Sequence, residues 1–122
     1  MNKPKTITID DIEYVRKSDQ KEIAATLNGL DYCIIRTYSA GVFAGYVESR
    51  NGKEVTLLKA RRLWQWHGAA SLSQLSTSGT SQPEKCKFPE EVEKVILTES
   101  IEILTCTKQA QDAIASVKVW AQ

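Results

Sequence analysis

The sequence lacks any apolar run long enough to cross a membrane, and it has only three cysteines and one histidine. A spanning helix needs about 20 apolar residues, so we do not expect a transmembrane protein. Cys33, Cys86 and Cys106 are widely spaced and form no Cys-x-x-Cys pair, which argues against a disulfide framework and a structural zinc site. Because the first residues also lack an apolar signal core, we expect the protein in the cytoplasm.

An excess of charge of one sign is missing as well. Sixteen lysines and arginines nearly balance fifteen aspartates and glutamates, for a formal charge of +1. No global field therefore attracts nucleic acid or an anionic membrane, and such binding would need a local patch. The sequence also has no glycine-rich phosphate loop, dinucleotide fingerprint or nucleophile elbow. A single histidine near serines does not make a catalytic triad, so we expect no enzyme, no cofactor and no metal site.

The patterns of apolar residues favour an α+β fold. At 122 residues, with 42% apolar residues, the chain is long enough for one domain with a core. We expect an antiparallel β-meander sheet of about five to seven strands with two or three short helices. The expected strands cover residues 30–37, 42–49, 54–60, 94–97 and 101–105, and the expected helices lie at 69–75 and after Thr107.

Residues 1–29 are predicted to form an N-terminal arm, separate from a core domain of residues 30–122. The arm would contain a short hairpin around Asp10-Asp11 and a helix that begins at Asp19. Asn28-Gly29 would end this helix, because glycine adopts the left-handed conformation without a Cβ clash.

Four further positions or segments have local signals. Asn51-Gly52 between two β-type runs predicts a type I′ hairpin turn. Gly41 and Gly45 in the second expected strand region predict a bulge or a close approach by another backbone or a ligand. The polar segment 76–83 is predicted to be an exposed, mobile loop, and Trp120 is predicted to cover the edge of the core.

The highest density of side chains suited to ligand binding lies in residues 60–75. If the preceding strand continues to Trp66, alternation places Arg62, Trp64 and Trp66 on one face. Indole rings stack on bases, a guanidinium binds phosphate, and the first turn of a helix offers N–H groups to an anion. We therefore predict a site for a small anionic, nucleotide-like ligand, formed by Arg36, Arg61, Arg62, Trp64, Trp66, His67, Ser71 and Ser73.

Other interpretations of these residues remain open. Tryptophans on strands are more often packed in a core, and the arginines would then be solvated. The protein could instead be a nucleic-acid-binding accessory protein, or an inhibitor that blocks a host protein through residues 76–87. Open strand edges and three tryptophans also favour a homo-oligomer.

Several motifs resemble a family of small uncharacterised proteins from tailed phages and prophages. They are RTYSAGVFAG at residues 36–45, ARRLWQW at 60–66 and GAASLSQL at 68–75. The resemblance covers about residues 30–120, while residues 1–29 resemble a separate short phage segment. These motifs have no known chemistry, so the resemblance implies no catalytic residue. It implies a bacteriophage accessory protein in an infected bacterium, a class that often antagonises host defence by binding a protein or sequestering a nucleotide signal.

Overall fold

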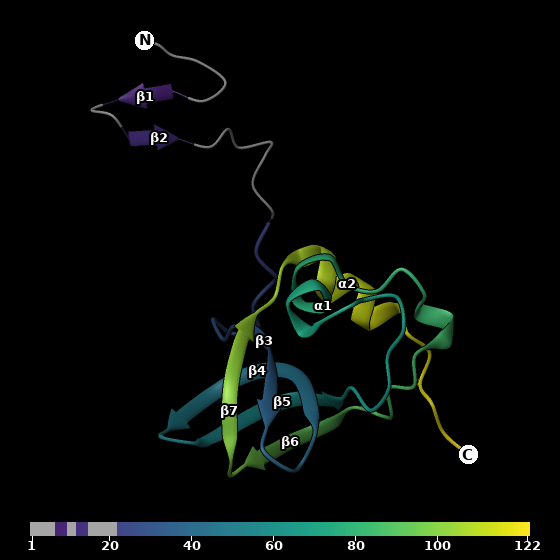
Figure 1. Ribbon diagram of the computed structural model, residues 1–122. Coiled ribbons are helices and arrows are strands. Elements are labelled where there is room, and N and C mark those ends of the chain that lie inside the picture. Colours follow the sequence, from purple (N-terminus) through teal and green to yellow (C-terminus); the bar gives the residue numbers. More distant parts are fainter. Residues whose placement is uncertain (1–6, 10–11, 15–21) are drawn as a thin grey trace.

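The computed structural model describes residues 7–9, 12–14 and 22–122. Within this part of the chain, five antiparallel strands form one sheet, and two helices pack together at one end of it (Figure 1). The strands are β3 (Tyr32–Thr37), β4 (Val42–Asn51), β5 (Glu54–Arg62), β6 (Val92–Leu97) and β7 (Ser100–Thr105). The helices are α1 (Leu72–Ser78), the 3-10 helix η2 (Pro83–Lys85) and α2 (Lys108–Ser116). The predicted α+β class is confirmed.

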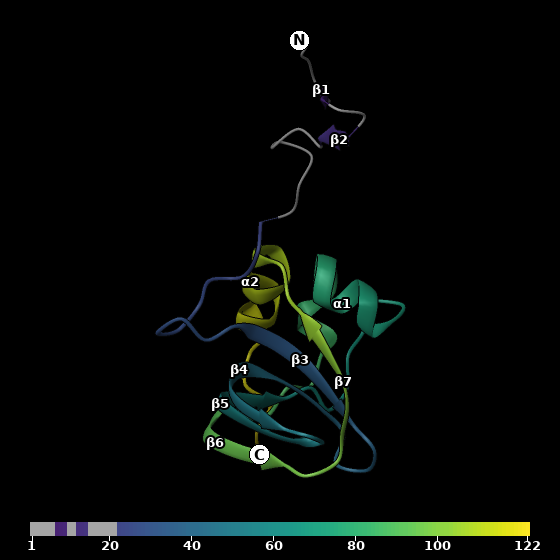
Figure 2. The same ribbon diagram turned by 90° about the vertical axis from the view of Figure 1, so that its left-hand side faces the viewer.

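The strand order is β6-β5-β4-β3-β7, and all neighbouring strands are antiparallel. β6 and β7 follow each other in the chain, separated by Thr98 and Glu99, yet they lie at opposite ends of this order. So short a link between the two edges requires the sheet to curl strongly, a shape that can be followed in Figure 2. The order is therefore not the simple meander that the sequence predicts.

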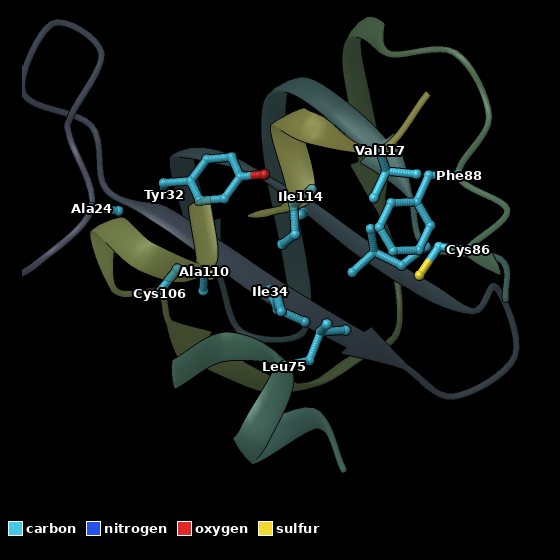
Figure 3. Packing of buried hydrophobic residues seen from close by; sticks show 12 residues of the cluster. Ala24, Tyr32, Ile34, Leu75, Cys86, Phe88, Cys106, Ala110, Ile114 and Val117 are labelled. Carbon is cyan, nitrogen blue, oxygen red and sulfur yellow. The ribbon is translucent and has the colours of Figure 1, made fainter. Parts of the chain in front are cut away.

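Because the sheet is curled, β3 is buried on both faces. Ile34 packs in a cluster beneath the helices, together with Leu75 of α1 and Ile114 of α2 (Figure 3). Ile35 points to the opposite face and packs in a second cluster, inside the curl, with Leu57. Ile34 and Ile35 are both fully buried, as their nearly continuous apolar run predicts.

The predicted irregularity at Gly45 is confirmed. The register between β4 and β5 shifts between Ala44 and Tyr46, and Lys59 on β5 has a positive φ of 52°. A Cβ atom on Gly45 would lie 2.9 Å from the carbonyl oxygen of Leu58. The bulge therefore brings two backbones too close together for any larger residue.

The hairpin at Asn51-Gly52 is confirmed, but its turn differs from the prediction. Strand pairing extends to Asn51 and Glu54, so the two turn residues are Gly52 and Lys53. Of these, only Gly52 has a positive φ, of 62°. Glycine thus occupies the first central position, as in a type II′ turn, whereas a type I′ turn needs two residues with positive φ.

Asn28-Gly29 does not end a helix. Asn28 and Gly29 have φ of 51° and 82°, and Leu27 and Leu30 exchange backbone hydrogen bonds of 3.1 and 2.9 Å. This geometry is that of a two-residue type I′ turn. Residues 22–30 contain no helix, and the predicted start of that helix at Asp19 lies outside the described residues.

The described residues near the N-terminus form a β-hairpin and a segment that packs against α2. β1 (Ile7–Ile9) and β2 (Ile12–Tyr14) pair antiparallel, so the predicted hairpin is confirmed. Residues 22–27 pack against α2: Ala24 N donates to Cys106 O at 3.1 Å, and the Gln111 amide bonds to both backbone groups of Ala25. Ala24 itself is part of the core beneath the helices.

Both helices begin at a side-chain cap: α2 starts after Thr107 as predicted, whereas α1 starts at Leu72, three residues after the predicted start at 69. Ser71 Oγ accepts from Gln74 N at the start of α1, and Thr107 Oγ1 accepts from Ala110 N at the start of α2. Neither helix of the described chain has the length and apolar character to span a bilayer.

The prediction of an exposed loop over 76–83 is wrong. α1 extends to Ser78, and Ser76 and Thr80 are both buried. Thr107 Oγ1 donates to Thr77 O at 2.6 Å, and the Thr80 hydroxyl donates to His67 O. The polar groups of this segment thus bind neighbouring backbone, which is how so polar a sequence can be buried.

Candidate functional site

The eight predicted ligand residues do not gather at one site. β5 ends at Arg62, so the tryptophans that follow are not on a continuing strand. Trp64 is exposed, but Trp66 packs against the core beneath the helices. Arg36 lies on β3 and forms an exposed ion pair with Glu102 of β7, with 2.9 Å between Nε and Oε1.

Arg61 is buried, with 8% of its surface exposed. Its Nε donates to Pro89 O at 3.0 Å and its Nη1 to Ile114 O at 2.8 Å. Its Nη2 donates to Phe88 O at 3.2 Å and to Val117 O at 2.7 Å. Burial lowers the pKa of the Arg61 guanidinium from its ordinary value. Arg61 therefore connects β5 to the chain around α2 and shares no surface with Arg62.

Arg62 points outward and is held by the turn that follows β3. Its Nη1 donates to Ala40 O at 2.6 Å, and its guanidinium carbon lies 4.4 Å from the centre of the Phe43 ring. Its remaining N–H groups have no hydrogen-bond partner among the described residues, so this exposed cation can also contact a ligand.

Trp64 and Trp120 form the most distinctive surface feature. Their ring centroids are 4.9 Å apart and their planes differ by 6°, so the two indoles are stacked. Trp64 is 55% exposed and Trp120 is 37% exposed. Lys87 Nζ lies 5.9 Å from the Trp64 centroid and 5.6 Å from that of Trp120. We call these three residues the Trp64–Trp120–Lys87 cluster.

Backbone pairing brings the cluster together. Gln65 and Lys87 form an antiparallel bridge, which places Lys87 beside Trp64. Val119 forms a parallel bridge with Phe88, and Trp120 N donates to Phe88 O at 3.0 Å. Lys87 was not among the predicted ligand residues, and Trp120 was predicted to lie at the edge of the core. No local pattern relates positions 64, 87 and 120, since only the fold brings them together.

The other three predicted residues, His67, Ser71 and Ser73, are exposed, and each makes a different local contact. His67 Nε2 is 3.5 Å from Gln65 Nε2, Ser71 caps α1, and the backbone oxygen of Ser73 accepts from Ser76. A helix as short as α1 gives little support to an anion site at its first turn. Over the described ranges, no group of His, Cys, Asp or Glu side chains is arranged to hold a metal ion.

Comparison with known proteins gives one match. Neither a curated protein nor a solved structure matches the chain. The model of one family, described as a domain of unknown function (DUF6948), matches residues 30–114. This segment contains the whole five-stranded sheet, α1, Arg62, Trp64 and Lys87. Because the match covers more than half of its length, the chain belongs to the DUF6948 family.

Proposed function

We propose that this protein is a non-enzymatic binding protein whose ligand, a nucleotide-like anion, contacts the Trp64–Trp120–Lys87 cluster. The observation that supports this is the stacking of two exposed indoles beside an ammonium group. Isolated exposed apolar residues are ordinary, but two tryptophans stacked in solvent and flanked by a cation are not. A base can stack on an indole face, and the ammonium can pair with a phosphate.

Arg62 adds a second cation on the same side of the chain. From Arg61 to Trp64 the side chains alternate between buried and exposed, with Arg61 and Leu63 inside and Arg62 and Trp64 outside. Alternate residues of an extended chain point to the same side, so the Arg62 guanidinium and the Trp64 indole face solvent together. The ligand would then meet a stacking surface between two positive charges.

The resemblance to phage and prophage proteins supplies the biological setting of this proposal. In that setting the protein acts in the cytoplasm of an infected bacterium and sequesters a nucleotide signal, which antagonises host defence. Sequestration requires tight binding but no catalytic group.

Self-association is part of the same proposal. β6 and β7 are the two edges of the sheet, and both expose apolar side chains, Ile96 on β6 and Ile101 on β7. Exposed strand edges pair readily with a second copy across a two-fold axis. Light scattering after size-exclusion chromatography should give the mass of a dimer for the wild type and a monomer for Ile96→Lys or Ile101→Lys. A monomeric wild type would contradict this part of the proposal.

A tryptophan fluorescence titration tests the ligand proposal. We would titrate the wild type with mono-, di- and cyclic nucleotides and with a short single-stranded oligonucleotide. The expected result is saturable quenching, weakened about tenfold or more in Trp64→Ala, because stacking on a base contributes about 1–3 kcal/mol. Trp66→Phe is the matched control, since it alters an indole outside the cluster and should leave the affinity unchanged.

Two outcomes would change the assignment. If only the oligonucleotide binds, with an affinity that falls steeply with salt, the protein is a nucleic-acid-binding accessory protein instead. If no nucleotide or oligonucleotide quenches the wild type, the nucleotide proposal is wrong, and a host protein becomes the partner to seek.

A further inference from the structure

A cavity of about 280 Å³ lies between α2 and strands β3, β4 and β5. It shares no residue with the Trp64–Trp120–Lys87 cluster. The residues that matter for its chemistry are Tyr32, Lys59, Arg61, Glu91, Ile114 and Val117.

Tyr32 places a hydroxyl group in this cavity. The residue is only 9% exposed, and Figure 3 shows its oxygen directed from β3 toward Ile114 on α2. The neighbouring Tyr46 hydroxyl accepts from Gln111 Nε2 at 3.2 Å, but the Tyr32 hydroxyl has no hydrogen-bond partner among the described residues. Burial raises the pKa of Tyr32 far above its ordinary value, so this hydroxyl is a hydrogen-bond donor at neutral pH. In the described part of the chain the only fully buried side-chain polar atom without a partner is Ser100 Oγ, so the Tyr32 hydroxyl still reaches solvent through the cavity and is free to donate to a ligand that enters it.

Arg61 supplies a second donor and a positive charge. A guanidinium has five N–H groups, and four of those on Arg61 bind backbone carbonyl oxygens. The fifth, on Nη1, has no partner in the described part of the chain. Arg61 also forms no ion pair with any described acidic residue. Its charge is therefore stabilised by neutral carbonyl groups and by the Phe88 ring, whose centre lies 5.5 Å from the guanidinium carbon, while the Glu91 carboxylate acts without forming an ion pair.

The remaining lining sets the charge and polarity of the cavity. Lys59 adds a second cation, which pairs with Glu93 at 3.1 Å on the exposed side. Glu91 is exposed and opposes an anion; because Lys59 is already paired with Glu93, Arg61 is the cation that remains for a ligand. Ile114, Ala115 and Val117 provide an apolar wall. A ligand that fits must combine hydrogen-bond acceptors and negative charge with a hydrocarbon part.

We propose that this cavity binds a small organic carboxylate. Its two oxygens accept from the Tyr32 hydroxyl and from Arg61 Nη1, and its hydrocarbon part lies against Ile114 and Val117. A carboxylate fits better than inorganic phosphate, because phosphate would leave the apolar wall without a partner. This site is independent of the proposed nucleotide surface, so either can fail without the other.

NMR titration of the full chain tests this proposal, with sodium benzoate as the probe and benzamide as its uncharged analogue. We expect benzoate to shift the backbone amide signals of Gln111, Ala115 and Val117 in a saturable way, with benzamide binding much more weakly. Tyr32→Phe should weaken benzoate about fivefold, which corresponds to one lost hydrogen bond. Tyr38→Phe removes the same group from an exposed tyrosine and should have no effect.

The other outcomes overturn the proposal. No saturable shift at these amides would show that the cavity does not bind carboxylates. Equal binding of benzamide, or unchanged binding by Tyr32→Phe, would show that charge and the hydroxyl are not recognised. Shifts confined to Trp64, Lys87 and Trp120 would assign benzoate to the surface cluster instead. Arg61 is not substituted in this test, because its loss would also remove hydrogen bonds that hold α2.

Discussion

Arg61 Nη1 donates a hydrogen bond to the carbonyl oxygen of Ile114 at 2.8 Å, which joins β5 to the last turn of α2. The last carbonyl groups of a helix have no partner within the helix, and they form its negative end. Arg61 Nη2 also binds Val117 O, just after α2 ends. One buried cation thus caps a helix that begins 47 positions later in the chain, at Lys108.

Replacing Arg61 with lysine should strongly destabilise the fold. An ammonium group lacks the planar fork that reaches all four carbonyl oxygens. Phe88 O and Ile114 O keep the backbone donors Trp120 N and Val117 N, so Pro89 O and Val117 O are the two acceptors that can lose their only partner. We expect the free energy of unfolding in urea to fall by about 3 kcal/mol. Arg62→Lys is the control: it loses one exposed bond and should cost less than about 1 kcal/mol. Equal losses in the two variants would disprove the capping role of Arg61.

Replacing Trp120 with alanine should remove the interaction between stacked indoles. Two stacked indoles at 4.9 Å couple their excited states, and a rotation of their long axes within the parallel planes gives a paired positive and negative band in the circular dichroism spectrum. We expect this band to disappear in Trp120→Ala and in Trp64→Ala, with a loss of stability of about 1 kcal/mol. Trp66→Phe should keep it. A band that survives in Trp120→Ala would mean that the pair does not stack in solution.

Substituting Gly45 with alanine should destabilise the β4–β5 pair. The new Cβ atom would lie 2.9 Å from Leu58 O and 3.1 Å from the Ala60 Cα atom, and neither backbone can move without breaking the ladder. We expect a loss of about 2 kcal/mol in thermal or urea unfolding. Ser49→Ala, at an exposed position on the same strand, should change stability little. A neutral Gly45→Ala variant would show that the bulge can relax.

The protein should become less stable at alkaline pH. Burial, with a smaller contribution from Cys33, raises the pKa of the Cys106 thiol from 9.0 to about 12. Above about pH 9 the thiol ionises in the unfolded chain but stays protonated in the folded one, so rising pH favours unfolding. At about pH 10 this amounts to about 1 kcal/mol. Urea midpoints should fall between pH 8 and 10, roughly, and fall less in Cys106→Ala. If the urea midpoint of Cys106→Ala falls by the same amount, the loss of stability at alkaline pH comes from other groups.

Local patterns were enough to predict most of the sheet. The run from Tyr32 to Ile35 indicated a strand buried on both faces, and the glycine at position 45 indicated the bulge. The prediction for Asn28-Gly29 was wrong because residues in the left-handed backbone conformation occur both at helix ends and in hairpin turns. In the structure residues 22–27 lie along Cys106 and α2 and form no helix; Ala24 N donates to Cys106 O, a contact between residues far apart in the sequence.

The candidate site was predictable only in part, for the same reason. Alternation correctly separated Arg61 and Leu63 from Arg62 and Trp64. It failed at Trp66, because β5 had already ended and the chain turns toward the core. Trp120 was assigned to the core on size alone, since nothing in the sequence reports its bridge to Phe88. The Tyr32 cavity likewise depends on α2 lying against β3, β4 and β5, which are far from it in the sequence.

The position of β7 also determines when the strands of the sheet can pair during synthesis. β3, β4 and β5 can pair as soon as residues 32–62 have left the ribosome, because they are joined by short turns. β3 must then wait for β7, since the pair Cys33–Thr105 closes a loop of about 70 residues. During synthesis, a nascent chain therefore carries a half-built sheet with both edges open, and it is most exposed to aggregation or chaperone binding until the last two strands emerge.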